Sequence, residues 1–263
     1  MILDYVETHL VEHCNLNCKG CGHFSSIADP HFTDFAVFER DFIRLGELFE
    51  NVTTVRLLGG EPLLHPEVLR FAGCVRRIFP RAKICLVTNG ILLPQQPDHF
   101  WQGCAATDLT VQLIRYPLRL DVEQIVQTAG RFGARLEMSR EITSFMQFMN
   151  FAGDSDPAVS FRNCQARFKC PFVQDGKIFL CALPPSVYIF NEEFHVNIPV
   201  SDEDWISIFG DTQPADILEF LRRPSRMCRW CLPEWPRFEW RVGSKGIEDW
   251  GGVAADPRLP VLQ

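Results

Sequence analysis

The sequence predicts an α/β fold: a partial, TIM-like (β/α) barrel followed by a small C-terminal domain with a β-hairpin and a helix. Strand-like and helix-like segments alternate up to about residue 145, which is typical of a parallel sheet with right-handed crossovers. The apolar runs at residues 57–58 and 84–87 are continuous, as in strands buried on both faces. About five or six strand–helix units are fewer than the eight of a closed barrel, so we expect an open barrel with ligands at the carboxyl ends of its strands.

Hydrophobic periodicity places the individual elements along the chain. The expected strands cover residues 3–11, 52–58, 82–87, 109–114 and 135–142. The expected helices cover residues 35–50, 66–79, 120–132 and 214–221. We expect the barrel in residues 1–150, a second domain in residues 151–250 after a Gly/Asp/Pro linker, and a loose tail in residues 251–263.

Composition excludes several classes of protein. With 46% hydrophobic residues and a net charge of −7, the chain can bury a core and has no general attraction to nucleic acid or anionic membranes. No apolar run approaches the roughly 18 residues of a membrane span, and the N-terminus lacks the basic region of a secretory signal. We therefore expect a cytoplasmic protein that binds neither a nucleic acid polymer nor a membrane.

The chain contains 11 cysteines, an unusual number for a protein of this kind. An odd count does not suit a closed disulfide framework, and nothing indicates an oxidising compartment, so metal binding is the favoured explanation. Cys74, Cys85 and Cys104 belong to no motif. We expect these three to be small core residues.

A first cysteine group, Cys14, Cys18 and Cys21, follows the first expected strand with the spacing C-x3-C-x2-C. Three thiolates on one loop can hold three corners of a 4Fe–4S cube and leave the fourth iron free for another ligand. A structural zinc site would need a fourth ligand, which His13 or His23 could supply, so zinc remains an alternative.

This cysteine spacing resembles the signature of the radical S-adenosylmethionine (radical SAM) superfamily. Residues 59–62 resemble its GGEP motif and residues 88–90 its TNG turn, each at the end of an expected strand and in the family's order. The resemblance implies that the first cysteine group ligates a 4Fe–4S cluster whose open iron binds the methionine part of S-adenosylmethionine. It implies cofactor-binding roles for Gly59, Gly60, Glu61, Pro62, Thr88, Asn89 and Gly90.

Within that set, Gly59, Gly60 and Glu61 would accept hydrogen bonds from the amino group of S-adenosylmethionine, and Pro62 would turn the chain. The family usually has an aromatic residue before the last cysteine, near the adenine. This chain has Gly20 there, and we expect Phe24 to take that place.

A second cysteine group lies in the C-terminal half and consists of Cys164, Cys170, Cys181, Cys228 and Cys231. Asp175-Gly176 predicts a two-residue hairpin turn, which would place Cys170 opposite Cys181. A disulfide fits that geometry but is disfavoured in a reducing cytosol. Four thiolates suit either zinc or an iron–sulfur cube, so both remain open.

The spacing of Cys164, Gly176 and Cys181 resembles the auxiliary-cluster domains of radical SAM enzymes, the SPASM type and the shorter twitch type. Since only one C-x2-C pair follows, the resemblance implies a twitch-like domain with one auxiliary 4Fe–4S cluster, for which five thiols compete. Trp230, Trp235, Phe238 and Trp240 are expected to pack around that cluster. Arg222, Arg223, Arg226 and Arg229 would stabilise it, bind an anionic substrate or form a solvated basic face.

The resemblance implies a radical SAM enzyme, an oxidoreductase or a sulfur-inserting transferase. It would cleave S-adenosylmethionine reductively and abstract a hydrogen atom from a small biosynthetic substrate of sugar, nucleoside or cyclitol type. The auxiliary cluster would support dehydrogenation, rearrangement or sulfur insertion, and a flavodoxin or ferredoxin would supply electrons. No catalytic side chain is identified.

The first expected strand starts at residue 3, so we expect no preceding peptide-recognition domain, which favours a small substrate. Two alternatives remain open. One is a peptide-modifying radical SAM maturase. The other is a non-catalytic iron–sulfur or zinc protein that transfers electrons or acts as a scaffold.

Overall fold

The computed structural model describes residues 1–243 and 245–251. Most of the expected tail, residues 252–263, therefore lies outside the described residues. Gly251, the first residue of that expected tail, forms a parallel bridge with Met149.

Five parallel strands, each but the last followed by an α-helix, form the barrel part of the chain. The strands are β1 (Ile2–Val11), β2 (Asn51–Gly59), β3 (Lys83–Thr88), β4 (Leu109–Leu113) and β5 (Arg135–Met138). The helices are α1 (Phe35–Leu48), α2 (Val68–Ile78), α3 (Asp98–Ala106) and α4 (Val122–Phe132). This arrangement confirms the predicted α/β fold with a mostly parallel sheet.

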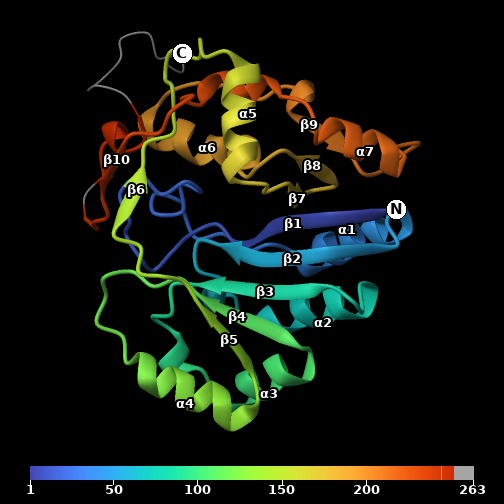
Figure 1. The fold of residues 1–263 in the computed structure, drawn as a ribbon, viewed down its shortest axis with the longest axis vertical. Helices are drawn as coiled ribbons and strands as arrows, with labels where there is room; N and C mark the ends of the chain where they lie inside the picture. Colours follow the sequence, from blue (N-terminus) through green and yellow to red (C-terminus); the bar gives the residue numbers. More distant parts are fainter. Residues whose placement is uncertain (244, 252–263) are drawn as a thin grey trace.

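The strand edge that carries the functional loops lies on one side of the molecule. Figure 1 shows the arrows of β2 and β3 pointing to the left of the view, toward the region that also holds β6 (Ser144–Met146) and β10 (Arg237–Glu239). β6 and β10 form a separate antiparallel pair. The carboxyl ends of the barrel strands therefore meet segments from the C-terminal half.

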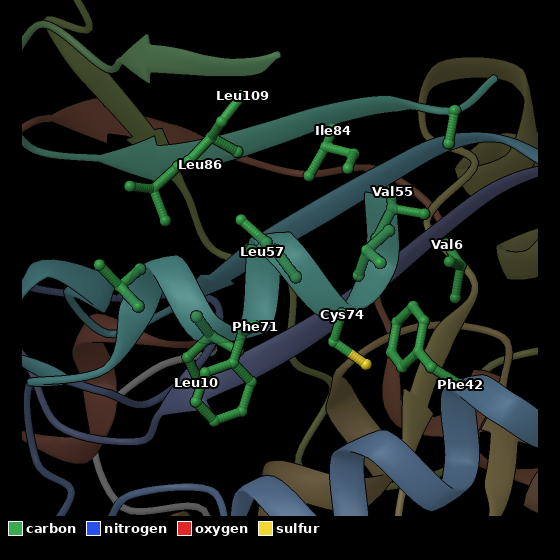
Figure 2. Close-up of a cluster of buried hydrophobic side chains, with 14 of the residues drawn as sticks. Val6, Leu10, Phe42, Val55, Leu57, Phe71, Cys74, Ile84, Leu86 and Leu109 are labelled. Atoms are coloured by element: carbon green, nitrogen blue, oxygen red, sulfur yellow. The ribbon is translucent and has the colours of Figure 1, made fainter. Parts of the chain in front are cut away.

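The main core lies between the sheet and its helices. Figure 2 shows Val55, Leu57 and Leu86 of the sheet packed toward Phe42 of α1 and Phe71 of α2. These side chains are fully buried, and burial of each such group contributes about 1.5–3 kcal/mol. The three cysteines without a motif, Cys74, Cys85 and Cys104, are also buried, which confirms them as core residues.

Two expectations about the barrel differ from the structure. The segment expected as a strand to residue 142 ends at Met138, because the chain then leaves the sheet to form β6. Helix α3 was not predicted, since its nine residues have only a weak apolar face around Phe100, Trp101 and Cys104. Tertiary packing of that short face decides its structure.

The C-terminal half extends the same sheet. Its hairpin consists of β7 (Phe172–Gln174) and β8 (Lys177–Phe179), joined at Asp175 and Gly176, which both have positive φ as a two-residue hairpin turn requires. β7 pairs in parallel with β1, and β9 (Trp205–Ser207) pairs with β8, so the eight strands follow the order β5-β4-β3-β2-β1-β7-β8-β9. Ladder pairing ends at Phe172 and Phe179, two residues short of Cys170 and Cys181.

Three further α-helices cover this half of the chain. They are α5 (Pro157–Arg167), α6 (Leu183–Phe194) and α7 (Pro214–Phe220). Short 3-10 helices are η1 (Pro62–Leu64), η2 (Leu93–Gln95), η3 (Asp202–Asp204), η4 (Arg226–Trp230) and η5 (Ile247–Asp249). None of the helices in the described ranges is long and apolar enough to cross a membrane.

Candidate functional site

The first cysteine group lies in the loop of residues 12–34 between β1 and α1, which we call the cysteine loop. Cys14, Cys18 and Cys21 line one cavity of about 210 Å³. The motif residues Gly59, Gly60, Thr88 and Asn89, at the ends of β2 and β3, line the same cavity. The fold thus brings together three segments that lie well apart in the sequence.

The two glycines at the end of β2 let the backbone pass directly against the cysteine loop. A Cβ atom on Gly60 would lie 1.9 Å from the carbonyl oxygen of His13, and one on Gly59 would lie 2.1 Å from that of Val11. Gly59 also has a φ of 141°, a conformation that L side chains rarely adopt. Only glycine fits this close approach without moving the backbone.

Glu61 links the motif at the end of β2 (residues 59–62) to the motif at the end of β3 (residues 88–90), and it does not line the cavity. Its buried carboxylate accepts hydrogen bonds from Thr88 Oγ1 at 2.7 Å and from the Asn89 backbone N–H at 2.9 Å. A third bond comes from the Leu63 N–H at 3.0 Å. Burial raises the pKa of Glu61 to about 7. Glu61 therefore holds the ends of β2 and β3 together, and its expected contact with S-adenosylmethionine stays a prediction.

Pro62 and Gly90 also stand behind the cavity wall. Pro62 begins η1, as its expected role in turning the chain requires. Gly90 has a φ of 82°, and its N–H donates to Thr88 Oγ1 at 3.0 Å. These residues shape the two strand ends, while Gly59, Gly60, Thr88 and Asn89 face the cavity.

The thiols of the first cysteine group suit a metal cluster chemically. Burial raises the pKa of both Cys14 and Cys18 to about 12, and it raises the pKa of Cys21 as well. They are therefore protonated thiols in the metal-free chain, and metal binding must displace their protons. Within the described ranges, no three His, Cys, Asp or Glu side chains lie close enough to hold a single metal ion. A cube binds each thiolate through a different iron and so accepts a wider spacing.

A segment from the end of the chain, which we call the C-terminal strap (residues 237–243 and 245–251), crosses the cysteine loop. Cys18 forms an antiparallel bridge with Val242, and the Lys19 N–H donates to the Arg241 carbonyl at 3.0 Å. The Trp250 indole N–H donates to the Cys21 carbonyl at 2.7 Å, and that of Trp240 donates to the Cys18 Sγ at 3.2 Å. Trp240 therefore lies at the first cysteine group, and its expected place beside the second was wrong.

Two aromatic residues near Gly20 also differ from expectation. A Cβ atom on Gly20 would lie 2.7 Å from the ring of Phe238, so this strap residue fills the space beside Gly20. Phe24, expected near the adenine, is fully buried against Phe190 and Trp250 and lines neither cavity described here. The structure thus places Phe24 in a buried hydrophobic cluster of the C-terminal half.

The second cysteine group gathers around a larger cavity of about 540 Å³, lined by Cys164, Cys170, Cys181 and Cys231. Burial first, then the neighbouring Cys170, Cys231 and Cys164, raise the pKa of Cys181 well above its usual value. Cys228 lies beside this set, since it contributes to the raised pKa of both Cys164 and Cys231. Chain segments spread over residues 164–231 thus converge on one place.

The two cavities adjoin each other, and we call the pair of them the chamber. Five residues line both cavities: Gly22, His23, Ile114, Tyr116 and Phe145. His23 is half-buried, and its ring is hydrogen-bonded to the Gly59 carbonyl. Desolvation lowers the pKa of this imidazole to about 3. His23 is therefore a neutral wall residue near neutral pH. The first cysteine group lies at one end of the chamber and the second at the other.

Glu7 is a functional candidate that the sequence analysis missed. It lies on β1, lines the large cavity and is only 5% exposed. Its Oε1 accepts hydrogen bonds from Arg56 Nη1 at 3.0 Å and from the Tyr5 hydroxyl. No described residue donates a hydrogen bond to its second oxygen. A glutamate in the middle of the first expected strand was the available sequence signal.

Comparison with known proteins agrees with this geometry. Residues 9–114 match the family model of the Radical SAM superfamily. The chain carries a radical SAM domain. This stretch holds the first cysteine group and both strand-end motifs. It ends at Ile114, a residue of the chamber wall.

Curated relatives match the radical SAM domain over a limited stretch. Molybdenum cofactor biosynthesis protein 1 of Dictyostelium discoideum is 38% identical over 100 residues, 36% of this chain and 15% of that protein. GTP 3',8-cyclase of Microcystis aeruginosa is 32% identical over 111 residues, 38% of this chain and 32% of that enzyme. The matched region thus spans at most about a third of these relatives.

A solved structure extends the likeness beyond the radical SAM domain. The crystal structure of BtrN in complex with AdoMet and 2-DOIA superimposes with a TM-score of 0.53 and 15% sequence identity. The match covers 88% of this chain and 93% of that one. The two proteins therefore share a fold over most of their length, including the C-terminal half that follows the radical SAM domain here.

Of the tryptophans and arginines expected near the second cysteine group, Trp230 and Trp235 lie there and the arginines do not line the chamber. Trp235 lines the chamber, and Trp230 packs in the same cluster as Cys181 and Cys231, as expected. The four arginines near Cys228 are not among the residues that line the chamber. Arg226 and Arg229 instead line a separate surface pocket with Ser225. Their expected role in binding an anionic substrate there is therefore not supported by their position.

Proposed function

We propose that this chain is a radical SAM enzyme that acts on a small molecule held between two iron–sulfur clusters. The observation that carries the proposal is the chamber itself. Its two ends are formed by the two cysteine groups, and five residues, His23 and Tyr116 among them, line both of its cavities. A substrate in the larger cavity would lie next to the cofactor cavity and to the second cysteine group.

The first cysteine group would hold a 4Fe–4S cluster. When bound, that cluster and S-adenosylmethionine supply a 5′-deoxyadenosyl radical that abstracts a hydrogen atom from the substrate. Gly59 and Gly60 would let the cofactor approach the backbone, and Thr88 and Asn89 would border it. Glu61 would hold these two strand ends together through its hydrogen bonds. The apolar wall formed by Ile114 and its neighbours would exclude water from the reacting centre.

The second cysteine group would hold an auxiliary 4Fe–4S cluster. Cys164, Cys170, Cys181 and Cys231 line the substrate end of the chamber, and Cys228 is the fifth candidate. The pKa values of these thiols are raised by burial, so cluster assembly would release protons here as well. A cluster at this place would serve dehydrogenation, rearrangement or sulfur insertion.

The chamber suits an uncharged small molecule better than a triphosphate. Apolar and aromatic side chains form most of the lining of the larger cavity, and Arg237 is the single arginine among its lining residues. Glu7 would accept a hydrogen bond from a hydroxyl or amino group of the substrate through its second oxygen. This supports a nucleoside, sugar or cyclitol derivative as the substrate class, with a flavodoxin or ferredoxin as the electron donor.

The test is anaerobic reconstitution with iron and sulfide, followed by incubation with S-adenosylmethionine and dithionite. We expect about eight irons per chain for two cubes, and the formation of 5′-deoxyadenosine. The matched control replaces Cys14, Cys18 and Cys21 with alanine. If the wild-type chain forms no more 5′-deoxyadenosine than this control, the enzyme proposal is wrong and a non-catalytic metal protein is favoured. Zinc in the second group, with one cube only, would contradict the auxiliary cluster.

A further inference from the structure

We propose that Trp240 is a positioning residue that tunes the first cluster. Its indole N–H donates a hydrogen bond to the Cys18 sulfur and thereby raises the reduction potential of the cluster. This inference rests on the proposed cluster at the first cysteine group and is independent of the substrate. It concerns a residue of the C-terminal strap, far outside the cysteine motif.

The contact is direct and buried. The Trp240 Nε1 lies 3.2 Å from the Cys18 Sγ, although the two residues are 222 positions apart in the chain. Trp240 is 9% exposed and Cys18 is 6% exposed, so water has little access to either partner. In such a dry environment, a hydrogen bond to a charged sulfur is stronger than it would be in water.

The indole ring is held on several sides. It stacks on the ring of Tyr116, with 5.2 Å between the ring centroids, and packs with Leu16. The Trp240 backbone N–H donates to the Thr143 carbonyl at 2.9 Å. The strap on either side is fixed as well, because Phe238 pairs with Phe145 in the β6–β10 ladder and Val242 bridges Cys18. The donor is therefore preorganised toward the sulfur.

Hydrogen bonds to the ligand sulfurs are one of the factors that set the potential of an iron–sulfur cluster. Reduction adds negative charge to the cluster and its thiolates. A donor that points at a thiolate stabilises this added charge, so the reduced state becomes more accessible. Lys245, also in the strap, acts in the same direction, since its ammonium group interacts electrostatically with Cys18 and Cys21.

A residue of the C-terminal strap thus influences how readily the first cluster accepts an electron. The cysteine loop alone would supply the three ligands but not this donor. A chain that lacks the indole N–H would still assemble the cluster, because the thiols and the strap backbone remain. Reduction of the cluster in such a chain would need a stronger reductant.

The experiment is an anaerobic redox titration of the reconstituted wild-type chain and Trp240→Phe, with the reduced cluster followed by electron paramagnetic resonance. Phenylalanine keeps an aromatic ring and removes the N–H. We expect the reduction equilibrium to become about tenfold less favourable, which is about 59 mV for one electron. A second variant carries benzothienylalanine at position 240, which preserves the shape of tryptophan without the N–H. We expect its reduction potential to fall by the same amount as that of Trp240→Phe.

Trp101→Phe is the matched control. Trp101 is fully buried in α3, and its Nε1 has no hydrogen-bond partner among the described residues, so this change removes an indole N–H that contacts no thiol. We expect its potential to equal that of the wild type. The auxiliary cluster serves as an internal reference whose potential should not move in any variant.

Equal potentials in the wild type and the benzothienylalanine variant would overturn the proposal, whatever the folding of Trp240→Phe. A shift of the same size in Trp101→Phe would also overturn it, because the effect would then be one of general packing. A wild-type chain that assembles no cluster would overturn both this proposal and the proposed function. A wild-type chain that assembles the cluster and shows an unchanged potential in the variants would overturn this one alone.

Discussion

The two cysteine groups are built in different ways. The first comes from one short loop, Cys14 to Cys21, directly after β1. The second draws on the C-terminal part of α5, the segment before β7, the loop after β8 and the 3-10 helix η4. Its cysteines are therefore brought together by the tertiary fold rather than by one loop. A local group can be identified from its spacing, whereas a group of this second kind depends on the fold.

The first group is nevertheless not autonomous. Its loop is bridged to the C-terminal strap at Cys18 and Val242, and the Trp250 indole donates to the Cys21 carbonyl. The ends of β2 and β3 reach the same cavity. One short loop thus supplies the cysteines of the first group, while distant segments fix the environment of these thiols.

The largest effect is expected from replacing Cys14, Cys18 and Cys21 together with alanine. This change removes all three protein ligands of the first cluster, so cleavage of S-adenosylmethionine should fall to the detection limit. Because the second group forms elsewhere in the fold, about four irons per chain should remain. Iron analysis and chromatography of 5′-deoxyadenosine measure both quantities. Loss of all iron would mean that the second group depends on the first.

The reverse change is alanine at Cys164, Cys181 and Cys231. We expect loss of about four irons and of product, with continued uncoupled formation of 5′-deoxyadenosine, since the first group keeps its ligands and its cavity. Cys85→Ala, in the core of β3, is the control for a lost buried thiol and should keep both clusters. If cleavage of S-adenosylmethionine also disappears in the triple variant, the first group needs the second to form.

The same difference explains what the sequence could and could not predict. The five barrel strands and the Asp175-Gly176 turn follow from local patterns, namely hydrophobic runs and a residue pair that adopts positive φ. The parallel pairing of β7 with β1 has no local signal, because it joins Phe172 to Glu7 across most of the chain. The extension of the barrel sheet by the C-terminal half was therefore not foreseen.

The site shows the same division. The cysteines of the first group and the glycines at residues 59 and 60 were predicted from their motifs to lie at one site, and they line one cavity. Trp240 is close to Cys231 in the sequence but lies at Cys18 in the fold, so the expected packing beside the second group is wrong. The strap instead crosses to Cys18, held by backbone bonds that no side-chain pattern reveals. Long-range register of this kind is decided by the packed fold.

A smaller effect, on stability, is expected from Gly60→Ala. The added Cβ would lie 1.9 Å from the His13 carbonyl oxygen, a backbone atom, so β2 and the cysteine loop must separate. We expect the free energy of unfolding to fall by about 4 kcal/mol, at the upper end of single substitutions, and cluster assembly to fail. Urea denaturation of the metal-free chain measures the change in the free energy of unfolding.

Gly73→Ala is the control for that substitution. A Cβ atom at Gly73, in α2, would meet no described atom within 4 Å, so alanine should stabilise the helix by about 0.5–1 kcal/mol. Equal stabilities of the Gly60 and Gly73 variants would show that the cysteine loop does not need the close approach of β2.

The smallest effect concerns Glu61, the long-range tie between the ends of β2 and β3. Burial raises its pKa to about 7 from the ordinary value of 4.5. A pKa that is higher in the folded state gives stability that is present at low pH and is lost as the pH rises through the folded-state value. Between pH 6 and pH 8, the metal-free wild-type chain should therefore lose about 1 kcal/mol more stability than Glu61→Gln, which cannot titrate.

Urea unfolding followed by tryptophan fluorescence at the two pH values measures this difference. All other titrating groups are common to both chains, so their contributions cancel. The glutamine side chain of the variant keeps the size of glutamate, although its amide group would face the Leu63 and Asn89 N–H donors, which lowers stability equally at both pH values. The same pH dependence in both chains would mean that Glu61 is already ionised at pH 6. The tie between the two strand ends would then be a permanent charge, and the first cysteine group would sit beside a fixed anion rather than a titrating one.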